Sequence, residues 1–196
     1  MALKKSRYDK DVFYFFTITC YKWINLFSST KIYDHIYSWF DILKSKGIQI
    51  TAFTIMPNHL HAIIFYPSEK SKINSQTNSE KSINQIIGTG KRFMAYEIIK
   101  RLKDNKEKEI MKTLIKGVKE EENRKGKIHQ VFQPSFDLKI IVTRKFLVQK
   151  INYIHMNPVV PKWNLVDDYR YYPHSSAGFY ELENYNGYPV THFDEM

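Results

Sequence analysis

Residues 50–65 read ITAFTIMPNHLHAIIF, and the organisation of the rest of the chain can be worked out from this stretch. Two apolar runs flank Pro57 and Asn58, which are typical turn residues, and this pattern predicts a β-hairpin. Side chains alternate faces along a strand, so His59 and His61 point the same way. Two imidazoles on one face can hold one divalent metal ion. The same spacing also arises by chance in a chain with seven histidines, so the pair alone is a weak signal.

The composition is that of a folded, basic protein. The 196 residues suffice for one domain with a hydrophobic core, and 43% of them are hydrophobic. Thirty Lys and Arg against twenty Asp and Glu give a formal net charge of +10, which suggests a polyanionic partner, most simply nucleic acid. The apolar runs fall short of the ~18–20 residues that span a membrane. With no secretory signal and a single cysteine, Cys20, we expect no membrane partner and a cytoplasmic location.

Apolar periodicity predicts the first half of a split sheet. An aromatic and β-branched run at residues 12–20 predicts the first strand. Helical spacing of apolar residues predicts a first helix over residues 31–46, with Gly47 at its C-terminal end. The hairpin at residues 50–66 then supplies the second and third strands.

The second half of the chain completes the pattern. Ser82 is expected to open a second helix, in which Gly88 and Gly90 permit a kink or the close approach of another backbone. A fourth strand is expected around residues 130–132, and a third helix over residues 144–156. The order is that of an α+β, ferredoxin-like split βαββαβ antiparallel sheet with an additional C-terminal helix. Since the first two helices cover one face of such a sheet, the third is expected to cross the other.

We expect a single domain over residues 1–196 with three additions to the sheet. These are a polar loop at residues 67–81, a charged insertion at residues 103–127 and an irregular C-terminal tail at residues 159–196.

The additional helix carries Tyr153 and, four residues further on, Asn157, so the phenol and the carboxamide share a face while His155 points elsewhere. If this helix crosses the face that presents His59 and His61, one pocket holds two imidazoles, one amide oxygen and one phenol. Three neutral ligands leave open positions on a metal, which a catalytic site requires. Tyr153 would then be a nucleophile beside a metal-bound phosphate. The simpler alternative is that Tyr153 only packs and Asn157 only ends the helix.

The segments MPNHLHAIIF and KINYIHMNPV resemble the two signature segments of the single-tyrosine HUH transposases, and in particular those of the REP-associated tyrosine transposases. Residues 59–61 match the His-hydrophobic-His motif, and residues 153–159 match the segment Tyr-Ile-His-x-Asn-Pro-Val. The insertion-sequence branch of this family usually has Gln at the position of Asn157, so a shorter amide takes its place here.

Further similarity lies at residues 91–93, at residues 132–141 and at residues 174–177, where His174 replaces the Trp of the family. The resemblance covers roughly residues 10–180, although the charged insertion is longer than the family leads us to expect.

The resemblance implies a single-stranded DNA endonuclease and strand transferase, that is, a transposase acting on hairpin-containing DNA. Tyr153 would be the catalytic residue, attacking a scissile phosphate to form a 5′-phosphotyrosine and release a 3′-OH. The implied cofactor is Mg²⁺ or Mn²⁺, held by His59, His61 and Asn157. Because the covalent intermediate conserves the phosphodiester energy, rejoining would need no ATP.

The implied partner is single-stranded or hairpin DNA, and the resemblance allows either a monomer or a homodimer. Four cationic residues are candidates for holding the DNA backbone: Lys91, Arg92, Lys139 and Arg144.

Three alternatives stay open. A replication initiator or relaxase of the same superfamily would have a similar site, although the short chain without a helicase region argues against it. A domesticated protein would bind hairpin DNA without cutting it. A metal-dependent hydrolase that activates water would not need Tyr153.

Overall fold

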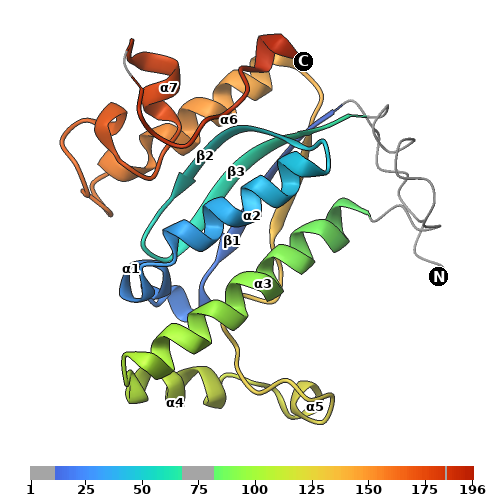
Figure 1. The fold of residues 1–196 in the computed structure, drawn as a ribbon, viewed down its shortest axis with the longest axis vertical. Coiled ribbons are helices and arrows are strands. Elements are labelled where there is room, and N and C mark those ends of the chain that lie inside the picture. The colour runs from blue at the N-terminus through green and yellow to red at the C-terminus, as the bar shows by residue number, and fades with distance from the viewer. Residues whose placement is uncertain (1–11, 68–81, 184) are drawn as a thin grey trace.

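A four-stranded antiparallel sheet lies at the centre of the molecule, with the strands in the order β2-β3-β1-β4 (Figure 1). The computed structural model describes residues 12–67, 82–183 and 185–196, so the expectations for residues 1–11 and 68–81 lie outside the described residues. The strands are β1 (Val12–Thr19), β2 (Gln49–Ile55), β3 (His59–Tyr66) and β4 (Asp137–Ile141).

Helices cover both faces of this sheet. α2 (Tyr33–Ser45) and α3 (Ile83–Asp104) lie on one face, whereas α6 (Arg144–Met156) and the short α7 (Ala177–Glu181) lie on the other (Figure 1). Because α2 joins β1 to β2 and α3 joins β3 to β4, the protein is α+β with the split βαββαβ order that the sequence predicts. The additional helix α6 crosses the face that α2 and α3 leave open, as expected.

Shorter elements connect or extend this framework. They are α1 (Leu26–Thr30), α4 (Lys108–Lys116), α5 (Glu120–Asn123), η1 (Tyr21–Trp23), η3 (Asn157–Val159), η4 (Tyr169–Tyr171) and η5 (Phe193–Glu195). α4 and α5 form the charged insertion and lie beyond the far end of α3, away from the sheet (Figure 1). α4 reaches the core through the buried Leu114, and its Ile110 and Met111 pack against the same cluster. Among the described residues, no helix has both the length and the apolar character needed to cross a bilayer.

The alternation of side chains along β1 divides the core into two clusters. Tyr14 and Phe16 lie in the larger cluster under α2 and α3. Phe15 packs on the opposite face with Ile63 of β3 and Leu147 of α6. Residues directly opposite each other in an antiparallel pair share a face. His61 is opposite Thr17 and therefore lies on the α6 face.

Two segments differ from the sequence-based expectation. The fourth strand begins at Asp137 and not at residues 130–132, because Pro134 interrupts the pairing and Phe132 makes only an isolated bridge to Cys20. Residues 25–29, for which the sequence predicts a loop, lie mostly within α1, because the Pro57 carbonyl accepts hydrogen bonds from the amides of Phe27 and Ser28. Both outcomes depend on contacts between residues that are distant in the sequence.

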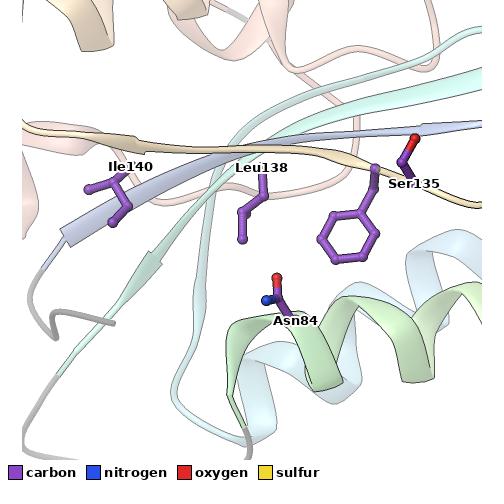
Figure 2. A pocket seen from close by; sticks show the side chains of 5 residues that line it. Asn84, Ser135, Leu138 and Ile140 are labelled. Carbon is purple, nitrogen blue, oxygen red and sulfur yellow. The ribbon is translucent and has the colours of Figure 1, made fainter. Parts of the chain in front are cut away.

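A shallow hollow of about 740 Å³ lies between the N-terminal end of α3 and β4, lined by Asn84, Ser135, Phe136, Leu138 and Ile140 (Figure 2). Leu138 is opposite Phe16 of β1, so the hollow lies on the α2–α3 face of the sheet. It is therefore on the opposite face from His61.

The two glycines of α3 have different roles. A capping box between Ser82 and Gln85 starts the helix. A Cβ on Gly90 would lie 2.3 Å from the indole of Trp39, whereas a Cβ on Gly88 would meet nothing within 4 Å. The close approach predicted for this region is thus made at Gly90, and the group that approaches is a side chain of α2.

Gly90→Ala and Gly88→Ala should shift stability in opposite directions. Gly88→Ala should raise the free energy of unfolding by about 0.5–1 kcal/mol, because alanine is the better helix former and the site is open. Gly90→Ala should lower it by about 1–3 kcal/mol through overpacking against Trp39. Urea denaturation of the two variants measures both changes, and an equal gain in both would contradict the contact with Trp39.

Candidate active site

The histidine pair lies where β3 begins, directly after the turn at residues 56–58. Their ring centroids are 4.7 Å apart, and both side chains are buried. The predicted hairpin therefore places the two imidazoles side by side on the α6 face of the sheet.

Hydrogen bonds from Asn58 determine which nitrogen of His59 is available. The Asn58 Nδ2 donates to the carbonyl of Trp23 and to Asn25 Oδ1, at 2.9 Å each. This orientation turns Asn58 Oδ1 toward His59 Nδ1, 2.8 Å away. Since a carboxamide oxygen can only accept, Nδ1 carries the proton and Nε2 keeps a lone pair. Nε2 is then the atom that can bind a metal.

His61 is held by β1. Its Nδ1 lies 2.8 Å from Thr17 Oγ1, and its ring stacks on Phe15 with the centroids 5.7 Å apart. Burial, and then the charge of Lys162, lowers the pKa of His59 to about 4. Burial also holds the pKa of His61 well below its ordinary value. Both imidazoles are therefore neutral at pH 7, which is the form that binds a metal.

Tyr153 of α6 lies against this pair. Its ring centroid is 5.4 Å from that of His61 and 6.3 Å from that of Phe15. The side chain is 50% exposed, so the ring packs while part of it stays open to solvent. Lys150, one turn earlier on α6, places its Nζ 5.1 Å from the Tyr153 centroid. The structure thus brings together the predicted nucleophile, the predicted metal pair and a cation.

Asn157 follows Tyr153 by one turn and is buried. Its Nδ2 donates to the Tyr153 carbonyl at 2.9 Å, which leaves its carboxamide oxygen without a hydrogen-bond partner in the part of the chain that the structure describes. A ligand role would need that oxygen, so this hydrogen bond is compatible with it. Ligation by Asn157 stays a prediction.

His155 points away from the pair, as the helical spacing predicts. Its Nε2 lies 2.8 Å from Ser176 Oγ, and its ring lies beside Tyr180 of α7. Residues 174–176 pair with the edge of β2, through a hydrogen bond from the Ile55 amide to the His174 carbonyl and one from the Ser176 amide to the Phe53 carbonyl. His155 therefore anchors α6 to the tail.

The donor set suits a divalent transition metal ion. Among the described residues, no three His, Cys, Asp or Glu side chains gather at one place. A metal at His59 and His61 would thus be completed by Asn157, by water or by a substrate oxygen. Imidazole nitrogen is a common ligand of divalent transition metals, whereas Mg²⁺ prefers oxygen ligands.

The predicted DNA-binding residues divide between the two faces. Lys139 is opposite Phe15, on the face of the histidine pair, and forms an ion pair with Asp137. Arg144 opens α6 and pairs with Asp194. Lys91 and Arg92 belong to α3, on the other face.

Lys91 is also engaged by its own chain. Its Nζ donates to the Gln133 carbonyl at 2.7 Å and to the Pro134 carbonyl at 3.3 Å. Burial lowers the pKa of Lys91 to about 8. Contact of these four residues with DNA stays a prediction.

Sequence reasoning missed several residues of the site: Thr17, Trp23, Asn58, Lys150 and Trp163. Lys150 precedes Tyr153 by three residues, so helical spacing could have identified it. Asn58 adjoins His59, and the sequence pattern marks it only as a turn residue. Trp23 and Trp163 contact the ring of His59 from distant parts of the chain, and no local pattern marks them.

Acid should unfold the protein partly through His155. Burial lowers its pKa to about 3, whereas the unfolded residue titrates near ~6.5, so its neutral form stabilises the fold fully above the higher value. Between these values the stability is lost as the pH falls, at up to about 1.36 kcal/mol per pH unit. His155→Gln keeps an amide donor for Ser176 but cannot be protonated. Denaturant titrations at pH 4, 5 and 6 should show that the free energy of unfolding falls less steeply with decreasing pH in this variant than in the wild type. An equal pH dependence in both proteins would contradict the role of His155.

Comparisons with known proteins give a match by structure. No protein-family model and no curated protein matches the sequence. The structure of a REP-associated tyrosine transposase bound to a REP hairpin matches with a TM-score of 0.51 at 19% identity, covering 91% of this chain and 84% of that chain. A provisionally assigned transposase from Deinococcus radiodurans R1 gives a TM-score of 0.40 at 13% identity, covering 78% of this chain and 95% of that chain. The resemblance seen in the two sequence motifs thus extends to the whole architecture, and the chain has the fold of a REP-associated tyrosine transposase.

Proposed function

We propose that this protein is a transposase that cuts and rejoins single-stranded DNA, with Tyr153 as its nucleophile. The observation that supports this best is the half-exposed Tyr153 ring, 5.4 Å from the ring of His61. The two sit in a chain with the fold of a REP-associated tyrosine transposase, and that protein was solved with a REP hairpin. Hairpin-containing DNA is therefore the proposed substrate.

The proposed reaction exchanges one phosphate ester for another. The Tyr153 oxygen attacks the scissile phosphorus, the bond from phosphorus to the 3′-oxygen breaks, and a 5′-phosphotyrosine forms. The phenol loses its proton, and the departing 3′-oxygen takes one up to become a 3′-OH. Attack of a 3′-OH on the phosphotyrosine reverses these steps, so strands are rejoined without ATP.

Residues around Tyr153 would assist this attack. A phenol is mostly protonated at neutral pH, so negative charge develops on its oxygen as the proton leaves. The Lys150 ammonium, near the Tyr153 ring, would stabilise that charge. Burial and the nearby Lys139 lower the pKa of Lys150. Lys139 and Lys150 would also attract the phosphates on either side of the cut.

The proposed cofactor is Mn²⁺ or Mg²⁺, with His59, His61 and Asn157 as its ligands. When bound there, the ion would polarise the scissile phosphate and fix its orientation. The role of the chain is to hold the ligands: Asn58 orients the His59 ring so that its Nε2 is available, and Thr17 fixes the orientation of the His61 ring.

The proposed site is formed within one chain. Tyr153 and the histidine pair meet in the same protein, so a monomer would contain all the proposed catalytic groups. A dimer is compatible with this arrangement but would not be needed for cleavage.

Tyr153→Phe should abolish cleavage while leaving the fold and the DNA affinity unchanged, because it removes only the hydroxyl. Wild-type protein incubated with Mn²⁺ and a labelled hairpin carrying a single-stranded flank should yield an adduct that survives denaturing electrophoresis and disappears with protease. Tyr96→Phe is the matched control, because Tyr96 is 72% exposed on α3. This variant should cleave the hairpin at the normal rate.

Two results would contradict the tyrosine mechanism. Normal cleavage by Tyr153→Phe would indicate a nuclease that activates water. Tight hairpin binding by the wild type with no cleavage and no adduct would instead indicate a DNA-binding protein that does not cut.

Metal affinity should depend on Asn58 although Asn58 is not a proposed ligand. Asn58→Ala should weaken Mn²⁺ binding about 10- to 100-fold, because the His59 ring loses the partner that sets its tautomer. His59→Ala and His61→Ala should abolish cleavage, and Asn157→Ala should have a milder effect because water can replace a neutral oxygen. Calorimetric titration with Mn²⁺ measures the metal affinity, and a hairpin-binding assay measures the DNA affinity separately. Unchanged Mn²⁺ affinity in His59→Ala would exclude the proposed metal site.

A further inference from the structure

Two tryptophans extend the site beyond His59. The Trp23 centroid lies 5.4 Å from the His59 ring, the Trp163 centroid lies 5.2 Å from it, and the two indoles are 6.1 Å apart. Trp23 is 48% exposed, which is unusual for so large an apolar side chain in a well-packed chain. Together with His61 and Tyr153, these rings form a continuous row that starts at the proposed nucleophile.

The backbone that presents these indoles is strained. Lys22 and Trp23 have φ angles of 50° and 59°, and Asn164 has a φ of 41°. Such values are uncommon outside glycine and costly for a bulky residue, and they persist where the surroundings enforce them. Asn58 enforces the turn at Trp23, because its Nδ2 donates to the Trp23 carbonyl. The same carboxamide therefore positions Trp23 and orients His59.

The charge around the indoles favours an anionic ligand. Lys162 places its Nζ 4.8 Å from the centroids of both Trp23 and Trp163. Lys22 adjoins Trp23 in the same exposed turn. Aromatic rings next to cations are the usual means of holding single-stranded nucleic acid, with bases on the rings and phosphates on the cations.

We propose that Trp23 and Trp163 form a stacking site for an unpaired nucleobase next to the scissile phosphate. This deepens the proposed function and rests on it for the position of the phosphate. The base would stack on the exposed indole surface, and the Lys162 ammonium would move from the rings to a phosphate of the same strand. Because every base has a π-face, the site would accept any base and would position the strand without reading its sequence.

The test compares a normal oligonucleotide with abasic ones in a protein that cannot cut. In the Tyr153→Phe background, fluorescein-labelled (dT)8 and versions with one abasic position moved along the strand are titrated by anisotropy. Loss of the base that occupies the site should weaken binding about 5- to 150-fold, the range for one stacked base. Trp23→Leu and Trp163→Leu should weaken binding of (dT)8 in that range and should abolish the difference between (dT)8 and the abasic strand.

Controls separate stacking from other effects. Tyr96→Leu removes an exposed ring on the opposite face and should keep the full difference between the two strands. Trp23→Phe keeps an aromatic face and should retain part of the difference in affinity between (dT)8 and the abasic strand. Because Trp39 is buried in the core, its fluorescence reports whether the Leu variants are folded.

Three results would overturn the proposal. Equal binding of (dT)8 and all the abasic strands by the parent protein would exclude a stacked base. A full difference retained in both Leu variants would place the stacking elsewhere. Self-association of the parent protein in sedimentation, lost in the Leu variants, would assign the indoles to a contact between copies. None of these three results changes the outcome expected in the phosphotyrosine assay. Failure of this proposal can therefore be distinguished from failure of the Tyr153 mechanism.

Discussion

The side chain of Asn58 connects the parts of the candidate site. Its oxygen accepts from His59 Nδ1, and its nitrogen donates to Asn25 and to the carbonyl of Trp23. A buried carboxamide can satisfy all these bonds in one orientation only, so the tautomer of His59 and the position of the Trp23 turn are set together. The bonds lie at the turn between β2 and β3, which makes the geometry of this hairpin the constraint on which the site depends.

The sheet is the second constraint, because one of its faces carries most of the apolar core and the other carries the candidate site. One face of β1 and β3 carries the larger apolar cluster under α2 and α3. The other face carries a smaller cluster under α6, with the histidine pair at the N-terminal end of β3, where that cluster stops. The smaller cluster holds α6 through Leu147 and Ile151, so packing positions Tyr153 beside His61. In the part of the chain that the structure describes, the Tyr153 hydroxyl has no hydrogen-bond partner. The fold can therefore be stable while the phenol oxygen stays available.

Local patterns predicted most of this arrangement. Alternation put His59 and His61 on one face, and helical spacing put Tyr153 on a different face of α6 from His155. The fourth strand was misplaced because residues 130–132 and 137–141 have equally suitable compositions, and only pairing with β1 distinguishes them. Trp23 and Trp163 were not predicted because their common neighbour, His59, is distant from both in the sequence. Lys91 looked like a free surface cation, since its carbonyl acceptors lie in a loop more than forty positions away.

The pairing of residues 174–176 and Thr191 with β2 affects the order in which the molecule can form. During synthesis, β2 and β3 leave the ribosome long before the segment that covers the β2 edge. Until that segment arrives, β2 presents unpaired amides and carbonyls that could pair with the strands of another nascent chain. During synthesis, this edge can be closed only after residues 174–191 have left the ribosome. This pairing also joins the tail to α6, because Ser176 contacts His155, so the helix carrying Tyr153 gains this additional anchor only when the tail has paired with β2.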